Sequence, residues 1–320
     1  MSDRALVVAA ASEIAKALGG AHRSGAWWRC RCPVHGSQGA TLALRDGDRG
    51  GLAIKCFGGC CSHEVYAQLR RLGLLTRVDR GEFIPPPDAT LARRRAPAEA
   101  ADRVRRIANA LDLFRNDSRS AKGTLVERYL RSRGLALEIP ATIRASLSWL
   151  RHSESGEMRP AMVALIEHIL HGRTGVHLTY LALDGSQKAT LQPDRRFLGP
   201  VGGGAVRLAP AAETLMVGEG IETCLAAMQA TAMPAWAAVS TSGVKALVLP
   251  PIVRTIIILV DNDVNGAGEA AASLAGWRWL AEGRRVRLAK PPVPGTDFND
   301  VIVGRTPERA TGGLADVDHR

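Results

Sequence analysis

The C-terminal third of the chain alternates short apolar runs with longer segments in which apolar residues recur every three or four positions. The short runs predict strands, and the longer segments predict amphipathic helices. The predicted strands are Thr214–Val217, Ala235–Val239, Thr255–Val260 and Arg285–Leu288, and the predicted helices are Ile221–Ala230, Val244–Leu247 and Ala267–Glu282. Strict alternation of this kind predicts an α/β domain with a parallel sheet and helices on both faces.

The middle of the chain has a mixed pattern. Ile107, Leu111 and Phe114 share one face of a predicted helix. A second helix is predicted over Thr124–Arg133, and strands are predicted at Ala161–His168, Val176–Leu183 and Val206–Leu208, with turns at His171-Gly172 and Asp184-Gly185. We therefore expect a mixed α/β subdomain in this region.

The N-terminal region contains two predicted helices around a cysteine-rich segment. The first helix covers Ala5–Leu18 and stops at Gly19 and Gly20. The second presents Val65, Leu69 and Leu72 on one face and ends at Gly73. Residues 76–100 then contain three consecutive prolines and three consecutive arginines, which predict an extended basic linker between two folded parts.

Five of the six cysteines lie within the first 61 residues, which indicates a metal site in a reducing compartment rather than a disulfide framework. Cys32 with His35, and Cys56 with Cys60, form two knuckles whose four donors suit one tetrahedral structural zinc ion. A buried thiol cluster is the alternative. Cys30 and Cys61 each neighbour a predicted ligand. We prefer Cys32 and Cys60 because of the C-P-x-H turn and because two glycines before Cys60 let the knuckle bend, although the choice between Cys60 and Cys61 stays open. Cys224 is expected in the core.

Acidic residues stand where apolar runs of the C-terminal third stop. They are Glu219, the pair Asp261 and Asp263, and Asp297. Side chains at i and i+2 of an extended segment point the same way, so Asp261 and Asp263 can project together. The carboxyl ends of parallel strands lie at one edge of a sheet, so these carboxylates are expected at the same edge. Mg²⁺ is usually bound by carboxylate and phosphate oxygens. The pattern predicts metal-dependent phosphoryl or nucleotidyl transfer, whereas any one carboxylate could instead cap a helix.

Composition supports a polyanionic partner. The 320 residues carry a net charge of +11, although a basic surface can also serve solubility alone. No signal-peptide pattern opens the sequence. The most apolar region, Leu247–Val260, is interrupted by Pro250, Pro251 and Arg254 and is shorter than the ~20 residues that span a bilayer. We therefore expect a cytoplasmic protein with no membrane partner.

These motifs together resemble the zinc-ribbon, Toprim-domain DNA primases, in particular the short ones of phages, plasmids and integrative elements. The resemblance covers nearly the whole chain. The motifs that carry it are Cys32-Pro-x-His35 with Cys56-x-x-x-Cys60, Glu127-Arg-Tyr-Leu130 with Arg133-Gly134, Gly218-Glu-Gly-Ile-Glu-Thr223, Asp261-Asn-Asp-Val-Asn-Gly266 and Asp297-Phe-Asn-Asp300. One departure is Thr223, where replicative primases have an Asp, and whether the neighbouring Glu222 joins the metal site stays open. The C-x₃-C spacing of the second knuckle is another departure.

The resemblance implies a domain order and a metal site. The expected parts are a zinc-ribbon DNA-binding domain (1–78), a flexible basic linker (79–100), an N-terminal subdomain of the catalytic core (101–210), a Rossmann-like Toprim domain (211–305) and a tail (306–320). It also implies that Glu219, Asp261, Asp263 and Asp297 bind catalytic Mg²⁺ or Mn²⁺, with two ions expected. Asp300 is a weaker member of this set and can instead cap a short C-terminal helix.

The resemblance further implies DNA primase activity on a single-stranded template with nucleoside triphosphates. Expected nucleotide and template contacts are Lys188, Arg195 and Arg196, with Arg128 and Arg133 ranked lower, although each can be a solvated surface charge. No G-x-x-x-x-G-K-[ST] motif occurs, so a separate helicase would unwind DNA. Rival functions are a Toprim nuclease and a non-catalytic DNA-binding protein. A topoisomerase is disfavoured because none of the three tyrosines lies in a recognisable partner domain.

Overall fold

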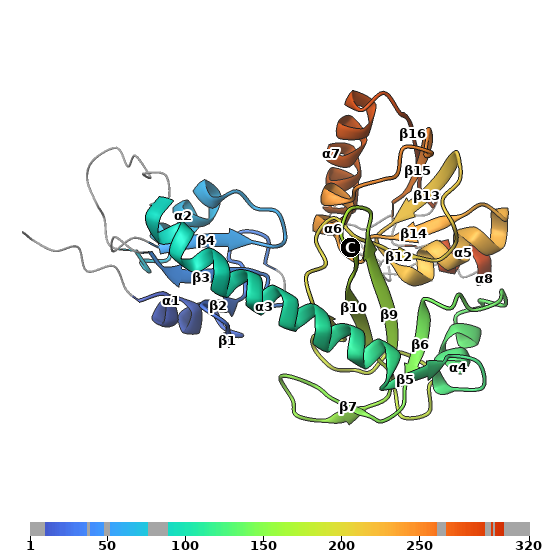
Figure 1. Ribbon diagram of the computed structural model, residues 1–320, viewed down its shortest axis with the longest axis horizontal. Helices are drawn as coiled ribbons and strands as arrows, with labels where there is room; N and C mark the ends of the chain where they lie inside the picture. The colour runs from blue at the N-terminus through green and yellow to red at the C-terminus, as the bar shows by residue number, and fades with distance from the viewer. Residues whose placement is uncertain are drawn as a thin grey trace, which may run out of the picture.

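A computed structural model describes residues 10–36, 39–47, 52–75, 89–260, 267–291, 296 and 298–303. The described residues form an N-terminal unit with one small sheet, a middle part with an antiparallel sheet, and a C-terminal part with a mainly parallel sheet (Figure 1). None of the helices within these ranges is long and apolar enough to cross a bilayer.

The N-terminal unit is a four-stranded antiparallel sheet covered by two helices. Its strands pair in the order β1-β2-β3-β4. The elements are α1 (Ala11–Leu18), β1 (His22–Ser24), β2 (Trp27–Cys30), β3 (Leu42–Asp46), β4 (Leu52–Cys56) and α2 (Ser62–Arg71). Ile14 of α1 and Val65 and Leu69 of α2 pack with Leu42 and Leu44 of the central strand. This core is too small to support a sheet easily without a further source of stability.

The ends of the two helices follow from local chemistry. Gly19 ends α1 with a φ of 79°, a conformation that favours glycine. A capping box begins α2, because Cys61 and Glu64 satisfy each other's backbone N–H groups. Leu72 is 49% exposed, so the prediction that it shares the buried face is wrong. The reason is that α2 ends at Arg71 and Leu72 follows as the C-cap residue.

The predicted extended linker is partly helical. Helix α3 covers Ala89–Arg115 and contains Pro97, so residues 89–100 belong to a helix rather than to a flexible linker. An interior proline costs about 3 kcal/mol. Good helix formers, mainly Ala, Arg and Leu, surround it and favour the helix. Residues 76–88 lie outside the described ranges. The long helix extends from beside the N-terminal unit to the middle sheet (Figure 1).

The middle part is an antiparallel sheet with the strand order β11-β10-β9-β6-β5. Its strands are β5 (Ser118–Ser120), β6 (Ile143–Ser146), β9 (Ala161–His168), β10 (Gly172–Tyr180) and β11 (Arg195–Leu198), with α4 (Leu125–Ser132) and the hairpin β7 (Leu150–Arg151) and β8 (Met158–Arg159) beside them. Ala110 and Phe114 of α3 pack on Val163 and Val176 of this sheet. Strand β9 has the predicted bounds, whereas β5, β6 and β11 were not predicted because they are short and flanked by polar residues.

The C-terminal part confirms the predicted parallel sheet. Its elements are β12 (Val206–Arg207), β13 (Thr214–Gly218), α5 (Ile221–Thr231), β14 (Ala235–Ala237), α6 (Thr241–Ala246), β15 (Thr255–Leu259), α7 (Ala267–Ala281), β16 (Arg285–Ala289) and α8 (Phe298–Val303). The strand order is β12-β14-β13-β15-β16, and the last four strands in this order are parallel. Strand β12, predicted in the middle region, pairs antiparallel with β14 at the edge of this sheet.

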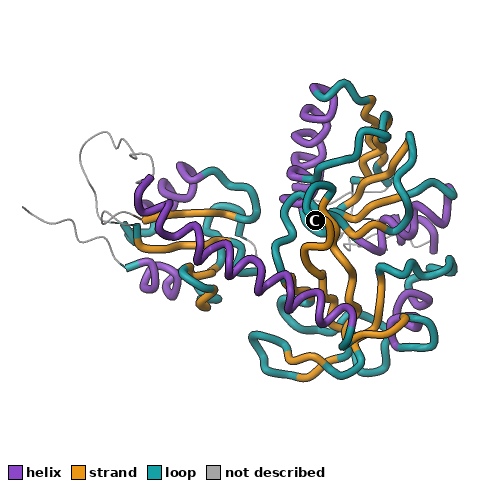
Figure 2. Tube along the Cα trace, in the orientation of Figure 1, coloured by secondary structure: helices purple, strands orange, loops and turns teal. Residues whose placement is uncertain are grey.

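Alternating residues of β13 explain why helices cover both faces of the C-terminal sheet. Met216 packs in one core cluster with Leu225 of α5. Its neighbours Leu215 and Val217 pack in a second cluster that includes Trp279 of α7. Successive side chains of a strand point to opposite faces, so a continuous apolar run needs cover on both sides. Figure 2 shows the purple helices on the two sides of the orange strands.

Candidate metal and nucleotide sites

The two cysteine knuckles bring four potential metal ligands together. The donor atoms of Cys32, His35, Cys56 and Cys60 all lie within 4.8 Å of one another. The Sγ atom of Cys32 lies 3.7 Å from that of Cys56 and 3.9 Å from that of Cys60. Four ligands at about 2.3 Å from a tetrahedral zinc ion place their sulfur atoms about 3.8 Å apart. The donor set therefore fits a closed, structural zinc site.

The Nδ1 atom of His35 faces the cysteine donors: it lies 3.0 Å from Cys60 Sγ and 3.7 Å from Cys56 Sγ. Its other ring nitrogen, Nε2, lies 3.1 Å from the hydroxyl of Thr41. A hydrogen bond of this kind fixes the tautomer and the ring orientation of a metal-binding histidine. Thr41 is a supporting residue that the sequence pattern did not reveal, because it belongs to neither knuckle.

The cysteines next to the cluster have other roles. The Cys61 thiol is exposed and accepts the backbone N–H of Glu64 at 3.4 Å as the N-cap of α2. Cys30 is buried on β2, and burial raises the pKa of its thiol to about 12. Contact with Cys32 lowers the pKa of Cys56 to about 5. The geometry therefore favours Cys60 over Cys61 and separates both spare cysteines from the donor set.

Gly58 lets the second knuckle close around His35. A Cβ atom at position 58 would overlap the imidazole ring of His35. The next residue, Gly59, has a φ of 89°, which few other residues tolerate. The two glycines of the C-x₃-C knuckle are thus required by close approach at one position and by backbone conformation at the other.

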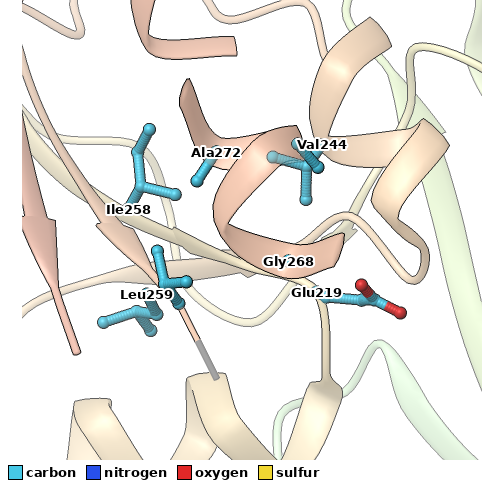
Figure 3. Close-up of a pocket in the computed structure, with 8 residues that line it drawn as sticks. Glu219, Val244, Ile258, Leu259, Gly268 and Ala272 are labelled. Carbon is cyan, nitrogen blue, oxygen red and sulfur yellow. The ribbon is translucent and has the colours of Figure 1, made fainter. Parts of the chain in front are cut away.

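Glu219 lies at the carboxyl edge of the C-terminal sheet, directly after β13. It lines a pocket with Val244, Leu259 and Ala272, and Figure 3 shows its carboxylate directed away from Ile258 and Leu259. Its backbone carbonyl accepts the N–H of Val239, a β-branched residue held at a φ of 59°. Such conformations cluster at functional sites. The half-buried carboxylate therefore stands at the edge where the sequence predicted the metal site.

The other predicted carboxylates are only partly covered by the structure. Asp261, Asp263 and Asp297 lie outside the described residues, so their roles stay predictions. Strand β15 ends at Leu259, which is the register partner of Gly218 in β13. In the sequence, Asp261 and Asp263 therefore follow the strand that is adjacent to the one that leads to Glu219. Asp300 lies in the first turn of α8.

Asn299 was not predicted as a site residue but has an unusual environment. It is fully buried on helix α8. In the sequence it stands two positions after the predicted ligand Asp297. Neither polar atom of its side chain has a hydrogen-bond partner among the described residues. Buried carboxamides normally form such bonds. Helix α8 thus carries a buried polar group at Asn299 and an acidic residue at Asp300.

The predicted basic residues divide into two groups. Arg195 and Arg196 are neighbours on β11, where Arg195 pairs with Thr179 and Arg196 pairs with Leu178. Cross-strand partners share a face. Leu178 packs with α3, so Arg196 belongs to the α3 face. Arg195 lies on the opposite face, toward the C-terminal domain.

Arg195 and Lys188 lie in the electrostatic field of the acidic edge. Burial lowers the pKa of Arg195, but the carboxylates of Asp194, Glu222 and Glu219 raise it by more. The Lys188 ammonium lies 3.2 Å from a carboxylate oxygen of Glu222. Arg128 instead donates to the carbonyl of Asp184 at 3.0 Å and is exposed. The cations that approach the acidic edge are therefore Lys188 and Arg195, whereas Arg128 and Arg196 point elsewhere.

Arg133, the remaining predicted cation, lies close enough to Tyr129 for its charge to lower the pKa of the phenol. Burial nevertheless raises the pKa of Tyr129 overall. Tyr129 donates a hydrogen bond to Glu222 across 93 positions of sequence. No periodicity in the sequence reveals this contact, because it joins two domains.

Comparisons with known families identify the C-terminal domain. Residues 214–308 match the Toprim domain model, and residues 104–208 match a domain of unknown function, DUF7146. The parallel sheet with helices on both faces is therefore a Toprim domain, as the sequence predicted. A search of curated proteins gives no match.

Several solved structures of DNA primases have a similar arrangement. The Aquifex aeolicus primase zinc-binding and RNA polymerase domains are 15% identical, with 91% of this chain and 79% of that chain covered and a TM-score of 0.40. A DnaG catalytic core is 18% identical over 58% and 70%, with a TM-score of 0.42. A Pseudomonas aeruginosa DNA primase domain is 21% identical over 49% and 52%, with a TM-score of 0.34, so the chain covers about half of that structure. These scores are below 0.5, and the domain identity rests on the Toprim match and the sheet topology.

Proposed function

We propose that the chain is a DNA primase, a nucleotidyltransferase that synthesises short primers on single-stranded DNA from nucleoside triphosphates. The observation that carries the proposal is the placement of Glu219 at the carboxyl edge of a Toprim sheet with the cations Lys188 and Arg195 directed toward the same edge. Carboxylates would hold divalent cations there, and the basic side chains would neutralise the triphosphate. The net charge of +11 is consistent with a nucleic-acid partner.

In the proposed reaction the 3′-hydroxyl oxygen of one nucleotide attacks the α-phosphorus of the next. The bond from that phosphorus to the pyrophosphate oxygen breaks, and the hydroxyl proton passes to water. Divalent cations held by Glu219, Asp261, Asp263 and Asp297, with Asp300 nearby, would activate the hydroxyl and stabilise the leaving group. Lys188 and Arg195 would orient the triphosphate, and no protein nucleophile is required.

The N-terminal unit is proposed to bind one structural zinc ion through Cys32, His35, Cys56 and Cys60 and to contact the template. Its core is small, so bound zinc would contribute directly to its folding. Zinc removal is expected to reduce primer initiation more than the extension of an existing primer. Equal loss of both activities, or loss of neither, would contradict a specific role of this unit in initiation. A separate helicase is proposed to supply the template strand.

The direct test is primer synthesis from labelled nucleotides on single-stranded DNA with Mg²⁺ or Mn²⁺. We expect short products with the unaltered chain and none with Asp261→Ala. Asp112→Ala is a suitable control, because Asp112 is an exposed carboxylate on α3 that bonds Asn116. Ribonucleotides and deoxynucleotides should be tested separately.

The same assay separates the rival functions. Mg²⁺-dependent cleavage of DNA without nucleotides, abolished by Asp261→Ala, would indicate a Toprim nuclease instead. DNA binding without synthesis or cleavage, unaffected by Asp261→Ala, would indicate a non-catalytic binding protein.

A further inference from the structure

Glu222 forms a buried polar cluster where the middle part meets the Toprim domain. It lies in the first turn of α5 and is 9% exposed. One oxygen atom, Oε1, accepts a hydrogen bond of 2.5 Å from the hydroxyl of Tyr129 and lies 3.2 Å from the ammonium of Lys188. The cluster thus joins helix α4, the loop after β10 and helix α5.

The carboxylate is ionised within this cluster. Burial by itself raises the pKa of Glu222, but the charge of Lys188 and the hydrogen bond from Tyr129 lower it by more, to about 2. Tyr129 is fully enclosed, and burial together with the carboxylate raises its pKa, so it remains a hydrogen-bond donor. The cluster therefore contains one anion, one cation and one neutral donor at neutral pH.

Stability alone is a weak explanation for this arrangement. A buried ion pair loses hydration that its attraction seldom restores, and apolar residues of similar volume are often as stable. Lys188 also keeps 35% of its side chain exposed, whereas the Glu222 side chain is only 11% exposed. The anion is thus enclosed, while the cation that it holds reaches the surface.

The ion pair with Glu222 places Lys188 near the acidic edge of the Toprim sheet. Glu222 is three residues after Glu219, on the helix that follows β13. Arg195 lies in the field of both carboxylates. His177, which is also in this field, is buried, and burial with the charge of Arg195 lowers its pKa to about 3, so it adds no charge. Lys188 and Arg195 are therefore the cations that this cluster presents at the edge.

We infer that Glu222 is a positioning residue that, together with Tyr129, fixes the Lys188 ammonium where it binds the triphosphate of a nucleotide. The inference rests on the proposed function for the identity of the ligand. A lysine has a flexible stem and a compact charge, so an anchored carboxylate restricts its position. Glu222 thus has a role different from that of a metal ligand, because its Oε1 atom is directed to Lys188 and Tyr129.

The test measures binding of inorganic tripolyphosphate to the full, zinc-loaded chain, because this probe needs no choice of base. The variants are Glu222→Gln, Lys188→Met and the combination of both. Glu167→Gln is the matched control, since Glu167 is a half-buried carboxylate that pairs with Arg173 at 3.5 Å elsewhere on β9. Binding is titrated over a range of Mg²⁺ concentrations, and the Tm of every variant is recorded.

We expect Glu222→Gln to weaken tripolyphosphate binding about tenfold and Lys188→Met to weaken it about 10- to 100-fold. The combined variant should bind no more weakly than Lys188→Met alone, because both changes remove one function. Tyr129→Phe provides a second measurement if Glu222→Gln does not fold, with an expected loss of about two- to tenfold. The Mg²⁺ concentration that supports half-maximal binding should not change.

Three results with the variants would overturn the inference. The first is unchanged binding in Glu222→Gln, and the second is a multiplication of the two single losses in the combined variant. The third is a shift in the Mg²⁺ dependence of Glu222→Gln with unchanged affinity at saturating Mg²⁺, which would identify Glu222 as a metal ligand. Absence of tripolyphosphate binding in the unaltered chain would also overturn it. Primer synthesis measured in parallel distinguishes the two proposals. Expected binding changes without any primer product would retain the positioning role and refute the primase.

Discussion

Replacement of Cys60 and of Cys61 by serine tests the proposed zinc site with two adjacent residues. Cys60 Sγ lies 3.9 Å from Cys32 Sγ and 3.0 Å from His35 Nδ1. Cys61 Sγ instead accepts the N–H of Glu64 at the start of α2. Serine is a good N-cap residue, so Cys61→Ser preserves the local function of that side chain. The two variants thus differ in whether they remove a metal ligand.

The expected difference in zinc affinity follows from the ligand count. The four donors form a closed set with sulfur separations of 3.7 and 3.9 Å, close to those of a tetrahedral site. Loss of an outer-shell partner costs about 10- to 100-fold in metal affinity. Loss of the Cys60 ligand should therefore cost more than about 100-fold, or about 2.7 kcal/mol. Cys61→Ser should stay within about threefold of the unaltered chain.

The assay is competition for zinc between the full-length protein and a chromophoric chelator. Co²⁺ substitution adds a spectroscopic measure, because thiolate-to-metal absorption should fall in Cys60→Ser and persist in Cys61→Ser. Cys30→Ala is a control for the loss of a nearby cysteine, since Cys30 is buried outside the donor set. Equal zinc loss in both serine variants, or retention of zinc by Cys60→Ser, would refute the proposed ligand set.

Three further predictions concern the knuckle, the buried cluster and a helix cap. Gly58→Ala should reduce zinc affinity at least tenfold by displacing His35. Gly39→Ala should not, because among the described residues a Cβ atom at position 39 would have only Thr41 near it, at 4.0 Å. Similar zinc affinities of the two variants in the same chelator titration would contradict this. Glu222 has a folded-state pKa of about 2 against an ordinary value of 4.5, so its stabilisation is present above pH 4.5 and lost as the pH falls toward 2. Between pH 5 and pH 2 the free energy of unfolding should therefore fall by up to about 3 kcal/mol more in the unaltered chain than in Glu222→Gln. Urea unfolding followed by tryptophan fluorescence measures this difference, and parallel pH profiles would refute the ion pair. Thr124→Ala should destabilise the part of the chain that contains α4 by about 1 kcal/mol, because Thr124 caps α4 through the Val126 N–H. An unchanged urea midpoint would contradict that role.

Hydrophobic periodicity was sufficient to predict the C-terminal domain. Strand β13 extends one residue beyond its predicted end, and helix α5 begins at the predicted residue. Both elements bury strong apolar runs, so local sequence and tertiary packing agree there. The predictions were less accurate where the apolar signal is weak. Three short strands of the middle sheet were missed, and α3 continues into a segment predicted as an extended linker.

Burial and long-range pairing explain the remaining differences. Strand β12 contains only two residues, and its place beside β14 depends on an antiparallel pairing about 30 residues away in the sequence. Arg195 and Arg196 appeared equivalent as neighbouring charges. Pairing with β10 sends them to opposite faces of one strand, so only Arg195 approaches the Toprim domain.

The sequence by itself determined the kinds of ligand and their order along the chain. It supplied a cysteine-and-histidine donor set near the N-terminus and an acidic residue, Glu219, at the end of an apolar strand. Only the tertiary structure distinguished Cys60 from Cys61, directed Thr41 to His35, and enclosed Glu222 between Tyr129 and Lys188. Local propensity sets which residues end a strand or form a knuckle, whereas the environment of a side chain depends on segments that are distant in the sequence and meet only after folding.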